Sequence, residues 1–179
     1  MIRRMRVRQP GFTIVELLIV VVVIGILAAI VIVAYNGIQQ SARDTVRKQD
    51  VATIGKALQL YAIENGGFMS AGSGCGGNGN GGGWFNYEGG SGYTVSINNC
   101  LINGGYMNQE IIDPSGSRAC GGLNCRAYFV STCTQGSRQV SYVYANLETV
   151  GHTSTDTDST CNTGIDTSIG SNYFIKLDL

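Results

Sequence analysis

The chain has 179 residues, which is enough for one globular domain and an attachment but not for two full domains. Its 12 lysines and arginines balance its 12 aspartates and glutamates, so no overall basic field indicates binding to nucleic acid. The 26 glycines exclude an all-helical protein. The single histidine, His152, has no evident nucleophile to activate, and we expect no enzymatic activity.

The positive charge is concentrated ahead of a long apolar segment. Four arginines fall within the first eight residues, at Arg3, Arg4, Arg6 and Arg8. From Leu17 to Tyr35 no side chain is charged or strongly polar, and as a helix these 19 residues would span roughly 28 Å, close to the hydrocarbon thickness of a bilayer. The positive-inside rule keeps the arginines in the cytoplasm and predicts a single-pass protein of the cytoplasmic membrane with its C-terminus outside.

The order of these segments differs from that of a secretory signal peptide, in which the cleavage site follows an apolar core of about 7–15 residues. Here the only obvious processing point, Pro10-Gly11-Phe12, precedes a longer apolar run. Cleavage by the general signal peptidase is therefore not expected, and a plain membrane anchor stays open as an alternative.

Glu16 is an ionisable residue at the edge of the apolar segment, where a charge is costly and is usually functional. A free α-amine at Phe12 would be a suitable partner, but Phe12 lies only four residues away at the same helix start. We therefore expect the Phe12 amine of one subunit to pair with the Glu16 carboxylate of its neighbour and so to set the register of an assembly.

Together with the arginine-rich leader, the segment Gly11-Phe12-Thr13-Ile14-Val15-Glu16-Leu17-Leu18 resembles the processing site of type IV prepilins and type II secretion pseudopilins. The resemblance implies that a prepilin peptidase removes residues 1–11 and methylates Phe12. It also implies that identical or related subunits assemble into a helical filament through an assembly platform and its ATPase. In one departure, many family members have a proline where this chain reads Ala29-Ile30-Val31-Ile32-Val33.

Residues 38–65 keep the helical periodicity but become amphipathic. The apolar stripe consists of Val51, Ile54, Leu58 and Tyr61. The charged side chains that predict a solvated face are Arg43, Asp44, Arg47, Lys48 and Asp50. Gly66-Gly67 predicts the end of the helix after Asn65. We thus expect one helix from about Thr13 to Asn65, with a transmembrane and assembly half over residues 12–37 and an amphipathic half over residues 38–65.

Residues 66–179 predict an extracellular head domain of the α+β class. Residues 66–92 contain 13 glycines and predict a long surface loop, which we expect Trp84, Phe85 and Tyr87 to attach to the domain. Four β-rich runs predict strands: Tyr93–Ile97, Arg126–Thr132, Val140–Asn146 and Tyr173–Leu177. A short helix is predicted around Leu101–Gln109. The expected fold is a small antiparallel sheet packed on the amphipathic half of the long helix, which is the type IV pilin fold that the resemblance implies.

All six cysteines follow the membrane segment: Cys75, Cys100, Cys120, Cys125, Cys133 and Cys161. An even count outside the cytoplasm predicts up to three disulfides. Zinc is the alternative, but Cys120 and Cys125 form the only close pair and no histidine is near them. Of the 15 pairings, we favour Cys75–Cys100, which would pin the glycine-rich loop, and Cys133–Cys161, which would close the C-terminal loop.

Asp156 and Asp158 alternate with hydroxyl side chains in the loop after His152. Oxygen ligands suit calcium, and the resemblance implies a calcium site in the corresponding loop of major pseudopilins. The competing interpretation is a solvated acidic loop. No other cofactor is expected.

The leading functional hypothesis is a structural subunit of a type IV pilus, which would reach the cell surface in a filament and serve adhesion or motility. One alternative is a pseudopilin of a type II secretion-like machine, which the segment Asp113-Pro114-Ser115-Gly116 and the acidic loop favour by their similarity to major pseudopilins. The other is a membrane-anchored domain that does not polymerise and binds a ligand through its aromatic, glycine-rich loop.

Overall fold

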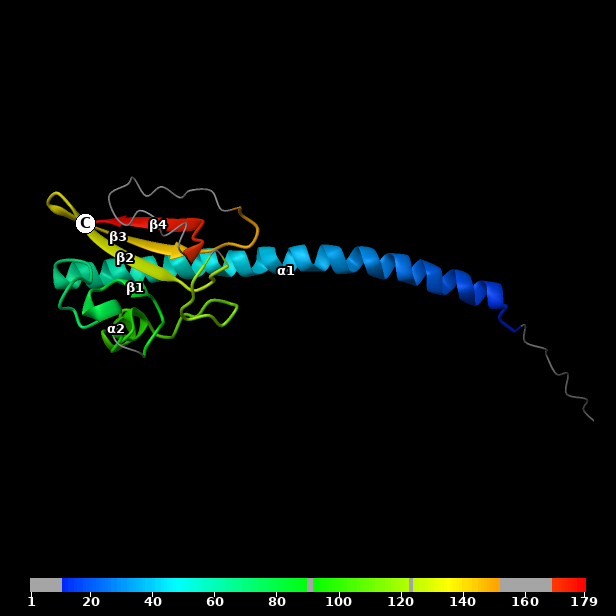
Figure 1. Cartoon of the computed structure of the whole chain (residues 1–179), viewed down its shortest axis with the longest axis horizontal. Helices are drawn as coiled ribbons and strands as arrows, with labels where there is room; N and C mark the ends of the chain where they lie inside the picture. The colour runs from blue at the N-terminus through cyan, green and yellow to red at the C-terminus, as the bar shows by residue number, and fades with distance from the viewer. Residues whose placement is uncertain (1–10, 90–91, 123, 152–168) are drawn as a thin grey trace, which may run out of the picture. The chain divides into compact units, whose positions relative to one another are not determined.

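The computed structural model describes residues 11–89, 92–122, 124–151 and 169–179 (Figure 1). The chain forms two compact units, divided between Gln39 and Gln40. Helix α1 (Ile14–Asn65) begins in the first unit and ends in the second. At its end Gly66 adopts a positive φ of 76° and the Gly67 amide donates to the Ala62 carbonyl, which satisfies a carbonyl that the helix leaves free. The predicted helix over Thr13–Asn65 is therefore confirmed.

The second unit contains a four-stranded antiparallel sheet in the order β1-β2-β3-β4. The strands are β1 (Gly83–Trp84), β2 (Phe129–Gln135), β3 (Arg138–Ala145) and β4 (Tyr173–Asp178). Gln135 pairs with Arg138 across a two-residue turn in which Gly136 has a φ of 62°, a conformation typical of tight hairpins. The predicted α+β class with a small antiparallel sheet is thus confirmed.

The predicted strand Tyr93–Ile97 is wrong. Ser96 instead begins helix α2 (Ile97–Asn103), since its hydroxyl accepts a hydrogen bond from the Asn99 amide at 3.1 Å. The short helix therefore starts four residues before the predicted Leu101. The strand that pairs with β2 at this side of the sheet is instead β1, which lies inside the glycine-rich segment.

The core lies between α1 and the sheet. Val51, Ile54 and Leu58 are buried against a cluster that includes Val130, Val143 and Leu177 of the strands, as the apolar stripe predicts. A Cβ at Gly55 would overlap the Ile175 side chain, so glycine at this position lets the helix approach β4 closely.

The glycine-rich segment is more structured than a surface loop. It holds a 3₁₀ turn (Gly77–Gly79) and β1, and Phe85 is fully buried in the core. Trp84 packs edge-on against Phe129 with the ring centroids 5.2 Å apart. Its aromatic residues thus attach this segment to the sheet, while the 3₁₀ turn and β1 are short elements that the prediction of a long surface loop did not include.

Candidate assembly segment and buried charge network

Glu16 forms hydrogen bonds with Thr13 at the start of its own helix. The amide and the hydroxyl of Thr13 each donate to Glu16 Oε2 at 2.8 Å, and the Glu16 amide donates to Thr13 Oγ1 at 3.2 Å. This reciprocal arrangement is a capping box, in which the carboxylate also lies at the helix end that favours negative charge. The Thr-x-x-Glu spacing of Thr13 and Glu16 is the sequence signal that predicts such a capping box.

The apolar half of α1 is uncovered within the chain. Every described side chain from Phe12 to Ile32, and that of Tyr35, is exposed. α1 is the one described helix that is long and apolar enough to cross a membrane. An apolar surface of this size requires lipid or other subunits around it. Together with the sequence motif at Gly11-Phe12, the segment indicates membrane anchoring.

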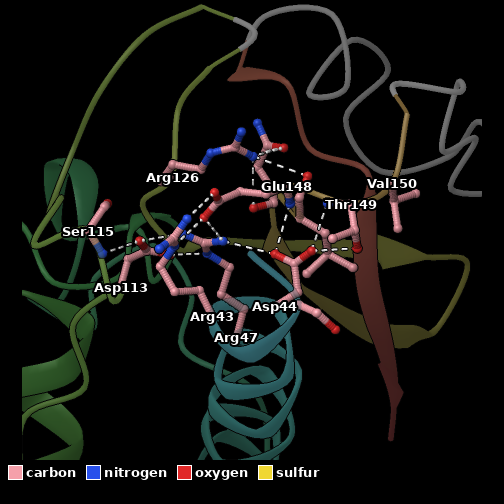
Figure 2. A network of polar contacts seen from close by, with 12 residues as sticks. Arg43, Asp44, Arg47, Asp113, Ser115, Arg126, Glu148, Thr149 and Val150 are labelled. Carbon is pink, nitrogen blue, oxygen red and sulfur yellow. Dashed lines mark hydrogen bonds and ion pairs between the residues drawn. The ribbon is translucent and has the colours of Figure 1, made fainter. Parts of the chain in front are cut away.

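The expectation of a solvated charged face on α1 was wrong for Asp44 and Arg47, which are both buried. Arg47 lies at the centre of a charge network that joins α1 to two distant loops (Figure 2). Its Nε and Nη2 donate to Asp113 Oδ2 and Oδ1 at 2.6 and 3.1 Å. Its Nη1 donates to Asp44 Oδ1 at 2.9 Å and to Glu148 Oε1 at 2.7 Å.

The network continues on both sides of Arg47. Arg43 donates to both oxygens of Glu148, at 2.8 and 2.6 Å. The Asp44 carboxylate accepts from the amides of Glu148 and Thr149, both at 2.8 Å, and so fixes the backbone after β3. Asp113 accepts from the Ser115 amide at 2.8 Å, which closes the turn in which Asp113 lies. The Arg47 guanidinium thereby joins three segments of the head: α1, the turn at Asp113 and the backbone at Glu148.

Two carboxylates in this network, those of Glu148 and Asp44, are kept ionised. The Arg43 guanidinium, assisted by Arg47, lowers the pKa of Glu148 to about 2. Burial alone would raise the pKa of Asp44, but hydrogen bonds from Glu148, Thr149 and Arg47 together lower it. The network therefore contributes to stability only while these groups carry their charges.

We expect the head to lose stability in acid. A carboxylate with a lowered pKa contributes its full stabilisation above its unfolded pKa and loses it as the pH falls through the folded value. For Glu148 the window runs from about pH 4.5 down to about 2, and the loss is about 3 kcal/mol. Urea titrations between pH 2 and pH 6 measure this, with Glu148→Gln as the variant that should flatten the slope. An equal slope in that variant would contradict the assignment.

A second buried polar pair lies beside the network. The Tyr128 hydroxyl donates to Asp50 Oδ2 at 2.6 Å. Burial raises the pKa of Asp50 despite this hydrogen bond, and it raises the pKa of Tyr128 strongly. Asp50, which the sequence predicts on a solvated face, is thus half-buried. Its partner Tyr128 directly precedes β2.

Disulfides join Cys75 to Cys100 and Cys120 to Cys125. The first is the expected bridge between the glycine-rich segment and α2. The second joins the close pair for which zinc is the alternative in the sequence. No described cysteine is free. The other expected bridge, Cys133–Cys161, and the two aspartates expected to bind calcium, Asp156 and Asp158, involve residues outside the described part of the chain.

We expect the two bridges to differ in their contributions to stability. Their sequence separations are 25 and 5 residues, and the loop-closure model gives about 3.5 kcal/mol for the longer loop and about 2 kcal/mol for the shorter one. Thermal unfolding of the Cys75→Ala/Cys100→Ala and Cys120→Ala/Cys125→Ala variants compares them directly. A larger loss in the second variant would contradict the entropic account.

Residues 6–32 match the family model of the prokaryotic N-terminal methylation motif. This match identifies the N-terminal segment as a prepilin-type methylation motif. The resemblance of the segment Gly11–Leu18 is therefore confirmed, and the pilin-like combination of a long N-terminal helix with a small antiparallel sheet is consistent with it.

Similar proteins extend the likeness beyond the motif. The type II secretion system core protein G of Pseudomonas aeruginosa is 42% identical over 60 residues, which are 34% of this chain and 42% of the relative. The core protein G of Vibrio cholerae is 35% identical over 63 residues, 35% of this chain and 42% of its own length. That of Aeromonas hydrophila is 34% identical over 58 residues, 32% of this chain and 41% of its own length.

This pilin-like chain thus spans about two fifths of the length of the curated relatives that it matches. No solved structure matches it.

Proposed function

We propose that this chain is a pseudopilin, a structural subunit of a filament in a type II secretion-like machine, without catalytic activity of its own. The observation that carries the proposal is the 42% identity with a type II secretion core protein over 60 residues. The prepilin segment and the uncovered apolar helix support it, because both suit a subunit that leaves the membrane for an apolar filament core. The similarity to secretion proteins favours a pseudopilin over the surface pilus that is the leading hypothesis from the sequence.

In this proposal a prepilin peptidase cuts between Gly11 and Phe12 and methylates the new N-terminus. The Phe12 amine of one subunit then pairs with Glu16 of the next, and an assembly platform with its ATPase builds the filament from identical or related subunits. A weak calcium site at Asp156 and Asp158 belongs to the same proposal. The cell surface is not the expected destination of a pseudopilin.

Intact-mass spectrometry of sheared surface material and of the membrane fraction tests the proposal. A species that begins at methylated Phe12 and stays with the membranes supports a pseudopilin. The same species abundant in sheared filaments supports a surface pilin instead. A Gly11→Val variant, with a branched side chain before the cut, serves as the unprocessed control. An uncut wild-type chain in a strain with the peptidase would exclude both.

A further inference from the structure

A small polar hollow lies where α1 ends. Its volume is about 270 Å³, and it is lined by Tyr61, Asn65, Gly66, Gly67, Phe68, Ser70, Ser73 and Gln139. The Phe68 amide donates to Gln139 Oε1 at 2.8 Å, so the helix end, the turn after it and the start of β3 form the walls together. Asn65 and Ser70 are exposed, and the hollow is therefore open to the solvent. We call it the α1-end hollow.

Polar side-chain atoms of the α1-end hollow are available to a ligand. Because Gln139 Oε1 accepts from the Phe68 amide, Gln139 Nε2 is a donor, and it makes no hydrogen bond to a described residue. The hydroxyls of Tyr61 and Ser70 likewise make none within the described part of the chain. Asn65 Nδ2 donates to the Tyr61 carbonyl at 2.9 Å, which leaves Asn65 Oδ1 as an acceptor. The hollow thus offers both donors and acceptors.

No charged side chain lines the α1-end hollow. The last turn of α1 has no basic residue, and a helix C-terminus carries partial negative charge, so an anion such as phosphate is disfavoured. A divalent cation is disfavoured as well, because the lining residues offer it no carboxylate. These properties favour a neutral ligand with several hydroxyl groups, since each hydroxyl can both donate and accept a hydrogen bond.

Tyr61 supplies an aromatic wall to the hollow. Its ring meets that of Tyr106 edge-on with the centroids 5.5 Å apart, and it packs against the core. The ring is therefore held in place. A fixed aromatic ring beside a few placed polar groups is the usual way in which a binding site combines an apolar surface with hydrogen bonds. A sugar complements both, because its C–H groups form an apolar face and its hydroxyls lie around the edge.

We propose that the α1-end hollow binds one unit of a neutral sugar. The sugar ring lies against Tyr61, and its hydroxyls bond to Gln139 Nε2 and Asn65 Oδ1. The volume suits a single ring, since pockets for drug-sized ligands begin at about 300 Å³. An uncharged peptide fits less well, because peptides are bound along extended grooves or sheet edges. The proposal goes beyond a structural role in a filament and does not depend on it.

Saturation-transfer difference NMR on the full chain in detergent tests the proposal. The detergent must lack a sugar headgroup, because such a headgroup would compete for the hollow. Glucose, galactose, mannose and N-acetylglucosamine are the probes, each at up to about 50 mM, since a ligand of this size is expected to bind with a dissociation constant of about 1–10 mM. At least one of them should give a signal that saturates with concentration. No saturable signal from any of them would overturn the proposal.

Two variants locate the bound sugar. Gln139→Glu keeps the acceptor for the Phe68 amide but replaces Nε2 with an oxygen, and it should weaken binding about tenfold. Tyr61→Leu keeps an apolar side chain against the core but removes the ring, and a loss of about tenfold is expected here too. The matched controls Gln59→Glu and Tyr87→Leu make the same changes outside the hollow and should bind like wild type.

Binding that survives both Gln139→Glu and Tyr61→Leu would place the sugar elsewhere and would overturn the site. Glucuronic acid serves as the charge control, and tighter binding of this anion than of the neutral sugars would overturn the ligand class. A capped glycine–serine peptide that binds at these residues when no sugar does would assign the hollow to peptides instead. If Tyr61→Leu lowers the thermal stability of the head, Gln139→Glu decides, because it keeps the hydrogen bond to the Phe68 amide.

Discussion

Replacing Glu16 with alanine is expected to lower incorporation into filaments more than tenfold while membrane insertion continues. The apolar segment Leu17–Tyr35 stays intact in this variant, so the chain still partitions into the bilayer. What is lost is the carboxylate that would receive the Phe12 amine of the neighbouring subunit, and an amine left unpaired in an apolar core is costly. Cell fractionation and quantification of sheared or detergent-extracted filaments measure the two effects.

Two matched variants separate the charge of Glu16 from its role as a helix cap. Glu16→Gln keeps an oxygen that can accept from the Thr13 amide but carries no charge, and it should assemble as poorly as alanine. Thr13→Ala removes the hydroxyl from the capping box but leaves the carboxylate, and it should assemble far better. Normal assembly of Glu16→Gln would show that the charge is not needed. If none of the three substitutions changed the amount of protein in the membrane and filament fractions, a plain membrane anchor would be favoured.

Replacing Arg47 with methionine is expected to lower the free energy of unfolding by about 3–5 kcal/mol. The change removes a fully buried cation and leaves Asp44, Asp113 and Glu148 without the positive charge that they share. Urea denaturation of the processed chain in detergent measures the loss, with near-ultraviolet circular dichroism as the probe of the head.

Two further variants test whether the loss of stability at Arg47 comes from its burial and from its pairing. Arg43→Met removes a guanidinium whose side chain is 34% exposed and should cost about 1 kcal/mol or less. In Arg47→Met/Asp113→Leu, both members of the most buried pair become apolar, and part of the lost stability should return. We expect that breaking the Arg47–Asp113 pair is costly, whereas replacing both members with apolar residues is less so. This expectation would be contradicted if the double variant lost more free energy of unfolding than the sum of the losses in Arg47→Met and Asp113→Leu.

Local sequence signals determined the N-terminal half of this protein. The apolar run, the Gly-Phe cut site and the glutamate that follows act within a few residues of one another, so their pattern is complete in the sequence. The same holds for the end of α1, where Gly66 supplies a conformation that other residues rarely adopt. Alternating β-rich runs also predicted β2, β3 and β4 to within a few residues, because strand periodicity is local.

Tertiary contacts decided the rest. The local pattern around Ser96 suits a strand or a helix start, and the cap that Ser96 makes decides for the helix. The sequence showed charged residues on one side of α1 and predicted a solvated face. Arg47 is nevertheless buried, because Asp113 and Glu148 arrive from 66 and 101 residues away and supply the carboxylates that it needs. Burial of a charge depends on such distant partners, and the periodicity of a single helix carries no information about them.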